Sequence, residues 1–238
     1  MNKKRIKRNL ILGILFFLPV FFVLILSLSK DNYNTLDIVK EGVVELPRND
    51  ADLTLKDHIT VLAFLGNKPM DNVIAASNLK ELIYDKFKGF KKFQIVVLVN
   101  ETAKEDAERL FREIATYEDL RFWHFVYANE YELLSTFKGL KSDIELDENL
   151  ATDHVFIVDT ELNQRGRLDD RTDNEIEKEQ PVYGLYSYDC IEVAVLKNKM
   201  GSEDLRVLFT EYRQKRKGNF DSTTRRAEDL NKKDEQEN

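Results

Sequence analysis

The longest apolar run in the chain follows a short basic segment. Leu10 to Leu28 contains no charged residue, and segment 1–8, MNKKRIKR, carries five positive charges and no acidic one. As a helix, these 19 residues would span roughly 28 Å at about 1.5 Å each, close to the hydrocarbon thickness of a bilayer. We therefore predict a transmembrane signal anchor over 9–29. A cleaved signal peptide stays open as the alternative, because Ser27 and Ser29 resemble a small-residue cleavage site.

Further along, the apolar positions change from continuous runs to helical spacing and back. Ile59–Leu65 and Phe93–Val99 are short, continuous and β-rich, which is typical of buried central strands. After each run the apolar residues recur at helical spacing, over 73–87 and over 103–116. The order strand, helix, strand, helix favours an α/β domain.

The next segment predicts a third strand and then a hairpin. Phe122–Tyr127 is an aromatic-rich strand, and Asn129 with Glu132 resembles a capping box at the start of a short helix. His154–Asp159 and Gln164–Leu168 flank a turn and predict a β-hairpin. Alternating elements that end in a hairpin imply a mixed central sheet with helices on both faces.

The C-terminal third is less regular. Asp169–Gln180 is acidic, and we expect a solvated loop, since it lacks the glycine and the fixed spacing of a calcium-binding EF-hand loop. Asp189–Met200 fits a strand by alternation and a helix by spacing, so both stay open. Ser202–Gln214 predicts a helix with acidic residues in its first turn.

These elements divide the chain into five expected parts. An early strand near Gly42–Glu45 is an alternative within the part at 30–50, which we otherwise expect to be a linker. The parts are a cytoplasmic basic N-terminus at 1–8, the anchor at 9–29, a linker at 30–50, one α/β domain at 51–216 and a disordered charged tail at 217–238.

Charge sets the expected orientation and excludes one class of partner. The positive flank should stay cytoplasmic, which makes this a single-pass protein of the inner (cytoplasmic) membrane with a periplasmic C-terminal domain. With the five basic residues of segment 1–8 set aside, 31 basic and 43 acidic side chains leave a net charge of −12. This acidity disfavours nucleic acid and anionic lipid headgroups as partners of the domain.

Two stretches resemble a known family. DLTLKDHITVLAFLG, at 52–66, resembles the entry into thioredoxin-like domains, and HVFIVDTELNQRGRL, at 154–168, resembles their terminal hairpin. In overall plan the chain is most similar to membrane-anchored Sco/SenC proteins, which help to load copper into respiratory oxidases. The resemblance covers about 50–168 plus the last helix, and it implies a three-layer thioredoxin-like domain.

The chain departs from this family where the family's chemistry lies. Pro69 stands where the first active-site cysteine would be, and Asn72 or Val73 occupies the second position. None of these side chains supplies a thiolate for disulfide exchange or for binding soft copper. Asp153 likewise occupies the position of the proline that precedes the hairpin strand in thioredoxins. The resemblance therefore does not carry redox or copper-transfer chemistry to this chain.

Two weak candidates for other chemistry remain. His154 lies near the place of the distal copper-binding histidine of Sco proteins, although several residues closer to the strand. Cys190 is the only cysteine, which excludes an internal disulfide, and we expect it to be half-buried and inert. The three histidines, His58, His124 and His154, are too scattered to show zinc-ligand spacing.

Our leading hypothesis is a non-catalytic, membrane-tethered thioredoxin-like protein that binds an unidentified protein partner. It would act in the assembly or maintenance of a membrane complex such as a respiratory oxidase, with no enzyme activity and no cofactor or metal. The alternative is a redox or copper-handling protein that uses non-standard residues, for example Cys190 with His154. A third hypothesis makes the chain a tether whose acidic domain and charged tail present an interaction surface.

Overall fold

The computed structural model describes residues 3–28, 35–49, 51–115 and 119–216, and within the first range the side chains of 11–24. It divides into two units, Met1–Asn34 and Thr35–Asn238, which we describe separately. The predicted tail at 217–238 lies outside the described residues.

The described part of the first unit is the helix α1, Lys3–Leu28, with Pro19 inside it. All the large apolar side chains described within it are exposed. In the part of the chain that the structure describes, no helix is both long enough and apolar enough to cross a membrane. The transmembrane anchor expected at 9–29 is therefore not confirmed and stays a prediction.

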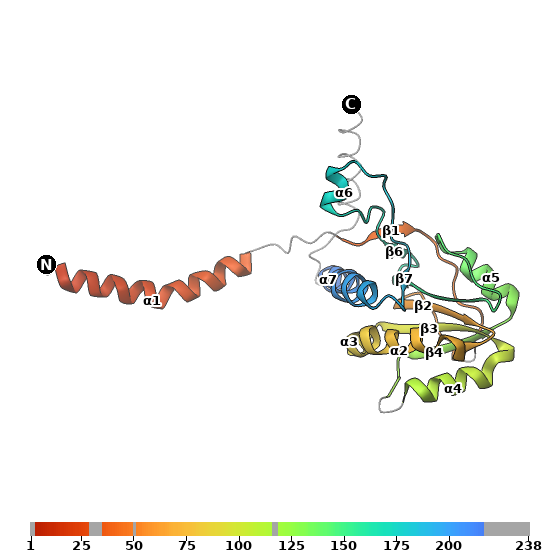
Figure 1. Cartoon of the computed structure of the whole chain (residues 1–238). Helices are drawn as coiled ribbons and strands as arrows, with labels where there is room; N and C mark the ends of the chain where they lie inside the picture. Colours follow the sequence, from red (N-terminus) through yellow and green to blue (C-terminus); the bar gives the residue numbers. More distant parts are fainter. Residues whose placement is uncertain (1–2, 29–34, 50, 116–118, 217–238) are drawn as a thin grey trace. The chain divides into compact units, whose positions relative to one another are not determined.

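The second unit is built around a seven-stranded mixed sheet with the order β1-β6-β5-β2-β3-β4, in which β7 pairs with β5 (Figure 1). β2, β3 and β4 are parallel, whereas β5 runs antiparallel to β2 and forms the expected hairpin with β6. The mixed sheet is thus confirmed. The strands are β1 Asp37–Lys40, β2 Ile59–Gly66, β3 Phe93–Asn100, β4 Trp123–Ala128, β5 Ala151–Val158, β6 Gln164–Gly166 and β7 Tyr188–Asp189.

The central strands explain their own sequence pattern. Every residue of β2 is buried, as are all but the last residue of β3. A strand that is covered on both faces has no polar face, so its sequence is continuously apolar rather than alternating.

Most predicted helices are present, and Asn129 and Glu132 form the predicted capping box at the start of α5. The predicted helix over 73–87 is a helical segment with one π turn, in which α2 and α3 flank η2. The helical elements of this unit are η1 Pro69–Asn72, α2 Val73–Leu79, η2 Lys80–Tyr84, α3 Asp85–Phe87, η3 Glu101–Ala103, α4 Lys104–Ile114, α5 Glu130–Lys138, α6 Asp173–Glu177, η4 Val195–Asp204 and α7 Leu205–Arg216.

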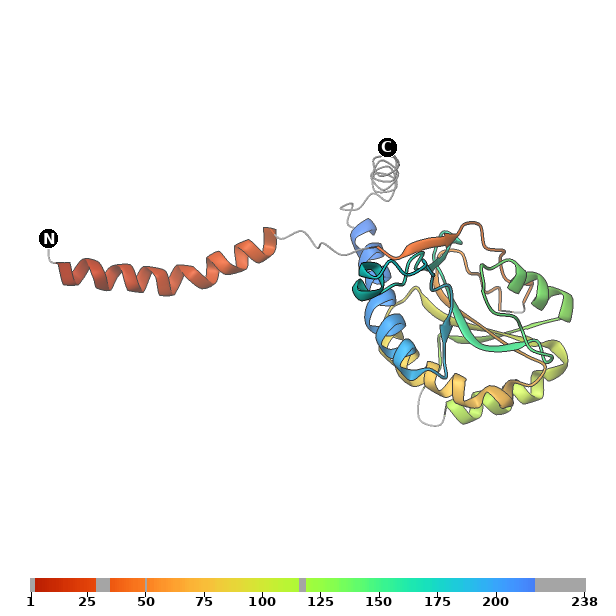
Figure 2. The same cartoon turned by 45° about the horizontal axis from the view of Figure 1, so that its top comes forward.

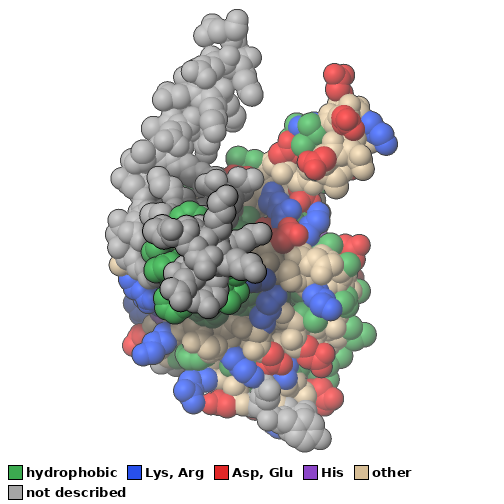
Figure 3. All heavy atoms as spheres, turned by 90° about the vertical axis from the view of Figure 1, so that its left-hand side faces the viewer, with side chains coloured by type: hydrophobic (Ala, Val, Ile, Leu, Met, Phe, Trp, Pro, Cys, Tyr) green, Lys and Arg blue, Asp and Glu red, His purple; other side chains and the backbone are tan. Residues whose placement is uncertain are grey.

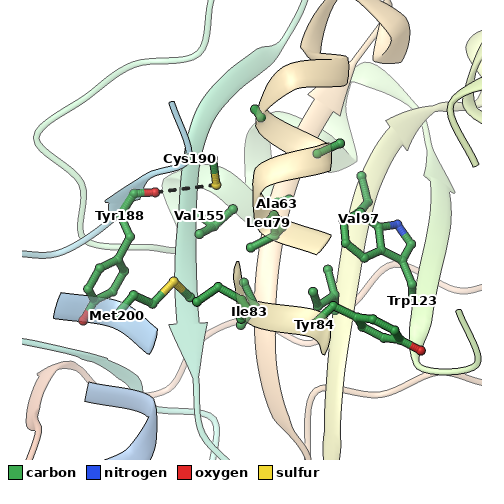
Figure 4. Close-up of a cluster of buried hydrophobic side chains, with 14 of the residues drawn as sticks. Ala63, Leu79, Ile83, Tyr84, Val97, Trp123, Val155, Tyr188, Cys190 and Met200 are labelled. Atoms are coloured by element: carbon green, nitrogen blue, oxygen red, sulfur yellow. Dashed lines mark hydrogen bonds between the residues drawn. The ribbon is translucent and has the colours of Figure 1, made fainter. Parts of the chain in front are cut away.

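The sheet separates two apolar clusters, as a three-layer domain requires. One cluster lies under α2, α3, α4, η4 and α7, and Figure 4 shows part of it between α2 and the strands. The other lies under α5, on the opposite face of the sheet (Figure 2). Successive residues of β2 point to opposite faces of the sheet, so Val61 lies in the first cluster and Leu62 in the second. Helices on both faces are thus confirmed.

The expected linker at 30–50 is corrected by the structure in its second half. β1 pairs antiparallel with β6, and it precedes Gly42–Glu45, the alternative position for an early strand. Leu36, Val43 and Leu46 are buried, and the backbone N–H of Val43 donates to the carbonyl of Leu162. These residues bury apolar side chains in the domain, so the domain extends to the N-terminal side of residue 51.

The C-terminal third also differs from expectation. Asp169–Gln180 is not only a loop, because it contains the short helix α6, and Asp170 is buried. Asp189–Met200 contains both of the alternatives left open: the end of β7, and then a helix from Val193 that continues through η4 into α7.

Candidate functional site

The turn after β2 is held rigidly against the loop that precedes β5. Gly66 has a φ of +49°, and a Cβ at this position would lie 1.9 Å from the carbonyl oxygen of Asn149. The backbone N–H of Asn67 donates to that same oxygen over 2.7 Å. Glycine adopts a positive φ without strain and is the residue that leaves room for this close approach, so the turn has one fixed path toward η1.

The three positions at which the family resemblance places cysteines contain no nucleophile. Pro69 is buried and begins η1, while Asn72 and Val73 are partly exposed at the start of α2. The backbone N–H of Met70 donates to Oδ2 of Asp106 over 3.0 Å, which ties the turn to α4. The turn is therefore held in place, and its side chains at these positions offer only a ring, an amide and an isopropyl group.

Beside this turn lies an open hollow of about 360 Å³ with acidic walls. Its polar lining comes from the turn, from the loop before β5, from β5 and from β7. The residues concerned are Asn72, Glu145, Asp147, Thr152, Asp153, His154 and Asp189. Across the described ranges, no three His, Cys, Asp or Glu side chains are grouped so that they could hold a metal ion.

The electrostatics of the hollow depend on Asp153 and His154. Partial burial raises the pKa of Asp153, the carboxylate of Asp189 raises it further, and His154 opposes this shift. Nδ1 of His154 is 3.0 Å from the hydroxyl of Ser187, and Nε2 is 4.0 Å from Oδ2 of Asp189. The carboxylates among these groups attract cations, but the set includes no thiol or other strong nucleophile.

Cys190 is 1% exposed and belongs to the cluster under α2 (Figure 4). Its Sγ lies 4.0 Å from the carbonyl oxygen of Tyr188. Burial raises the pKa of the thiol well above its ordinary value, and the carboxylates of Asp189 and Asp153 raise it further. The thiol is thus more deeply buried than the half-buried state we expected, and its environment makes it a poor nucleophile.

His154 and Cys190 do not share a site. His154 lies opposite Asp189 in the antiparallel pairing of β5 with β7, so these two side chains are on the same face of the sheet. Tyr188 and Cys190, on either side of Asp189 in the chain, both enter the apolar cluster on the other face. The sheet backbone therefore separates the imidazole from the thiol.

Sequence reasoning missed the acidic character of this hollow. Glu145 and Asp147 belong to an acidic stretch, DIELDEN at 143–149, which was a visible signal. Its proximity to Asp189 follows only from the pairing of β7 with β5, which joins segments far apart in the chain.

Comparison with known proteins gives fold-level likeness only. No family model matches the chain, and no curated protein does. The soluble domain of Sco1 from Bacillus subtilis is 12% identical, with a TM-score of 0.41 over 70% of this chain and 92% of that one. A SCO1/SenC family lipoprotein from Bacillus anthracis str. Ames is 12% identical, with a TM-score of 0.40 over 74% and 100%. A putative protein disulfide isomerase from Bacteroides thetaiotaomicron is 13% identical, with a TM-score of 0.39 over 71% and 96%. These three solved structures carry Sco/SenC or disulfide-isomerase names, whereas this chain has a single cysteine.

Proposed function

We propose that this chain is a non-catalytic, membrane-tethered protein of thioredoxin-like architecture that acts by binding another protein. The observation that carries the proposal is a turn held in one conformation by Gly66 and Asn149 whose side chains at 69, 72 and 73 have no thiol. The family resemblance supports a role in the assembly or maintenance of a membrane complex such as a respiratory oxidase.

The buried cysteine supports a role without redox or copper chemistry. A thiol that acts in exchange or binds Cu(I) must reach solvent as a thiolate, and Cys190 is enclosed by apolar side chains. The alternative of a redox or copper-handling protein that uses Cys190 with His154 requires both groups to reach one metal ion. Their positions on opposite faces of the sheet count against it.

Tethering is supported by the apolar run and by charge. The run Leu10–Leu28 falls within the single helix α1, whose described large apolar side chains are exposed. The basic segment 1–8 favours a cytoplasmic N-terminus, so the domain would lie on the periplasmic side of the inner membrane. The acidity of the remaining chain favours protein over nucleic acid as its partner.

The catalytic part of the proposal is tested with the purified full-length chain. We expect insulin reduction at the uncatalysed rate and no Cu(I) affinity beyond that of the Cys190→Ser variant. The Pro69→Cys/Val73→Cys variant restores the C-x-x-x-C spacing on the same scaffold, and thioredoxin serves as the positive control for the assay. Robust insulin reduction or tight Cu(I) binding by the unaltered chain would overturn the proposal.

The tether is tested separately in native membranes. The chain should stay in the membrane fraction after a high-salt wash, and protease added outside the inner membrane should digest the domain. Release by salt contradicts the anchor, and protection from that protease contradicts the orientation.

A further inference from the structure

A protruding segment between β6 and β7 has a surface that the fold does not use. We call residues 168–184 the arm; it contains α6 and stands out from the rest of the domain in Figures 1 and 3. Its base is closed by two backbone hydrogen bonds of 2.9 Å between Arg167 and Leu185. Gly166 cannot carry a side chain there, because a Cβ would lie 2.4 Å from the carbonyl oxygen of Leu185.

Ion pairs with two buried carboxylates fix the base of the arm to the C-terminal helical segment. Arg167 pairs with Asp170 in the arm at 3.0 Å and with Asp204 at 2.7 Å. Lys199 also pairs with Asp170, and Tyr188 donates to Asp204 over 2.7 Å. Asp170 and Asp204 are both buried. Since moving the arm away would leave a buried carboxylate without its cation, this base holds the arm in one position.

The arm is also ordered internally. Thr172 and Glu175 form a capping box at the start of α6. At its end, Glu179 has a positive φ of 52°, and the N–H groups of Glu179 and Gln180 donate to the carbonyls of Ile176 and Glu175. This is the hydrogen-bond pattern of a Schellman motif. The hydroxyl of Tyr183 donates to the carboxylate of Glu175.

This rigid arm exposes large apolar side chains. Leu168 and Tyr183 are each 45% exposed, Ile176 is 49% exposed and Val182 is 62% exposed. Four exposed large apolar side chains on one short segment that is held firmly in place are typical of a contact surface.

The charge around these side chains selects the kind of partner. The arm has six acidic and two basic residues, a net charge of −4. Asp173, Glu177 and Glu179 surround Ile176 in the sequence, and within the described ranges no ion pair involves them. Acidic surfaces repel each other and repel anionic headgroups, so this charge disfavours a second copy of the arm or an anionic bilayer as the occupant.

We propose that the arm is a docking surface for a segment of another protein in which Lys or Arg side chains flank apolar ones. The apolar side chains of that segment would cover Ile176, Val182 and Tyr183, and its cations would pair with Asp173, Glu177 and Glu179. This inference rests on the proposed binding role and adds to it a surface and a partner chemistry. Figures 1 and 2 place α6 and α2 on different sides of the domain, so the arm is distinct from the face of the turn.

The test uses the full-length chain in its native membrane, with a photo-crosslinking amino acid in place of Val182. A matched chain has the same substitution at Ile74, which is exposed on α2 by the turn. We expect an adduct from position 182 whose crosslinked peptide, identified by mass spectrometry, comes from another protein and contains Lys or Arg beside apolar residues. Position 74 should not give that adduct.

Charge reversal on the arm supplies the second part of the test. Glu177→Lys/Glu179→Lys, added to the position-182 chain, should weaken the adduct about tenfold, because two attractive pairs become repulsive. Both residues are exposed, so the thermal unfolding midpoint should not change. The assignment is overturned by any of four results: no adduct, an adduct with a second copy or with lipid, an acidic or uncharged partner segment, or an adduct that charge reversal does not weaken. None of these four results bears on the insulin-reduction and Cu(I) assays. Insulin reduction or tight Cu(I) binding in those assays would overturn the proposed function itself.

Discussion

The turn after β2 and the junction of β6 with α7 use polar side chains in opposite ways. At the turn, the positions that carry cysteines in the resembled family are apolar or amide residues, and the nearby carboxylates line a hollow that is open to solvent. At the junction, Arg165 is 4% exposed, and it is enclosed with Asp159 and Glu211, which are 1% and 2% exposed. Arg165 pairs with both carboxylates.

This difference shows which of the two regions buries charged side chains that need partners. Buried charges are tolerated only where each has partners, so the junction constrains sequence and geometry together. The turn constrains geometry alone, through Gly66 and Asn149. The junction fixes α7, and the neighbouring pairs of Arg167 fix the arm. Buried carboxylates paired with arginine thus fix the side of the domain that carries the arm.

The largest predicted effect comes from breaking the junction. Arg165→Met should lower the free energy of unfolding by roughly 3–5 kcal/mol, because it leaves two buried carboxylates without their main cation. Lys215, 3.3 Å from Glu211, compensates only one of them. The measurement is urea denaturation of the full-length chain, followed by Trp123 fluorescence.

The matched control for this prediction is Arg121→Met. Arg121 pairs with Asp119 at 3.1 Å, but both side chains are more than 70% exposed. Such a surface pair contributes less than about 1 kcal/mol. If the two variants lost the same stability, the contrast between a buried and an exposed pair would not hold for this protein.

A smaller effect should come from the backbone of the turn. Gly66→Ala places a methyl group in a positive-φ residue and against the carbonyl of Asn149. Gly42→Ala is the control, since Gly42 has a φ of +66° but no atom within 4 Å of the added Cβ. The left-handed conformation alone costs about 1–2 kcal/mol at either site. Gly66→Ala should exceed its control by at least about 1 kcal/mol in the same denaturation assay, and equal losses would show that the turn moves freely away from Asn149.

The sequence predicted the parts of the fold that are specified locally. Ile59–Leu65 and Phe93–Val99 are apolar throughout because both faces of these strands are covered, and a capping box needs only Asn129 and Glu132. β1 was not predicted, because its four residues are too few to establish a hydrophobic period. The ambiguity of 189–200 has a physical cause in η4, since a π-helix bonds residue i to i+5 and removes the 3.6-residue spacing.

The candidate site was predictable at the turn and not around it. The absence of cysteine at 69, 72 and 73 is a property of the sequence itself. That His154 and Cys190 face opposite sides follows only from the pairing of β5 with β7. Likewise, Arg165 and Glu211 are 46 residues apart in the chain, and no local pattern connects them.

The smallest predicted effect concerns the open acidic hollow beside the turn. The pKa of Asp153 is raised by burial and by Asp189, so the folded chain holds this proton more tightly than the unfolded chain does. Stability from this group is fully present below the unfolded pKa of about 3.9 and is lost as the pH rises through the folded pKa. At pH 7 the ionised carboxylate is therefore a net cost.

Asp153→Asn should remove that cost. The variant should be more stable than the unaltered chain at pH 7, by less than about 1 kcal/mol because the hollow is open to solvent, and the gain should vanish at pH 3. Denaturation at the two pH values measures it, with Asp143→Asn, an exposed carboxylate of the preceding loop, as the control. A stability gain of equal size at both pH values would mean that Asp153→Asn acts through packing. It would contradict a repulsion between the carboxylates of Asp153 and Asp189.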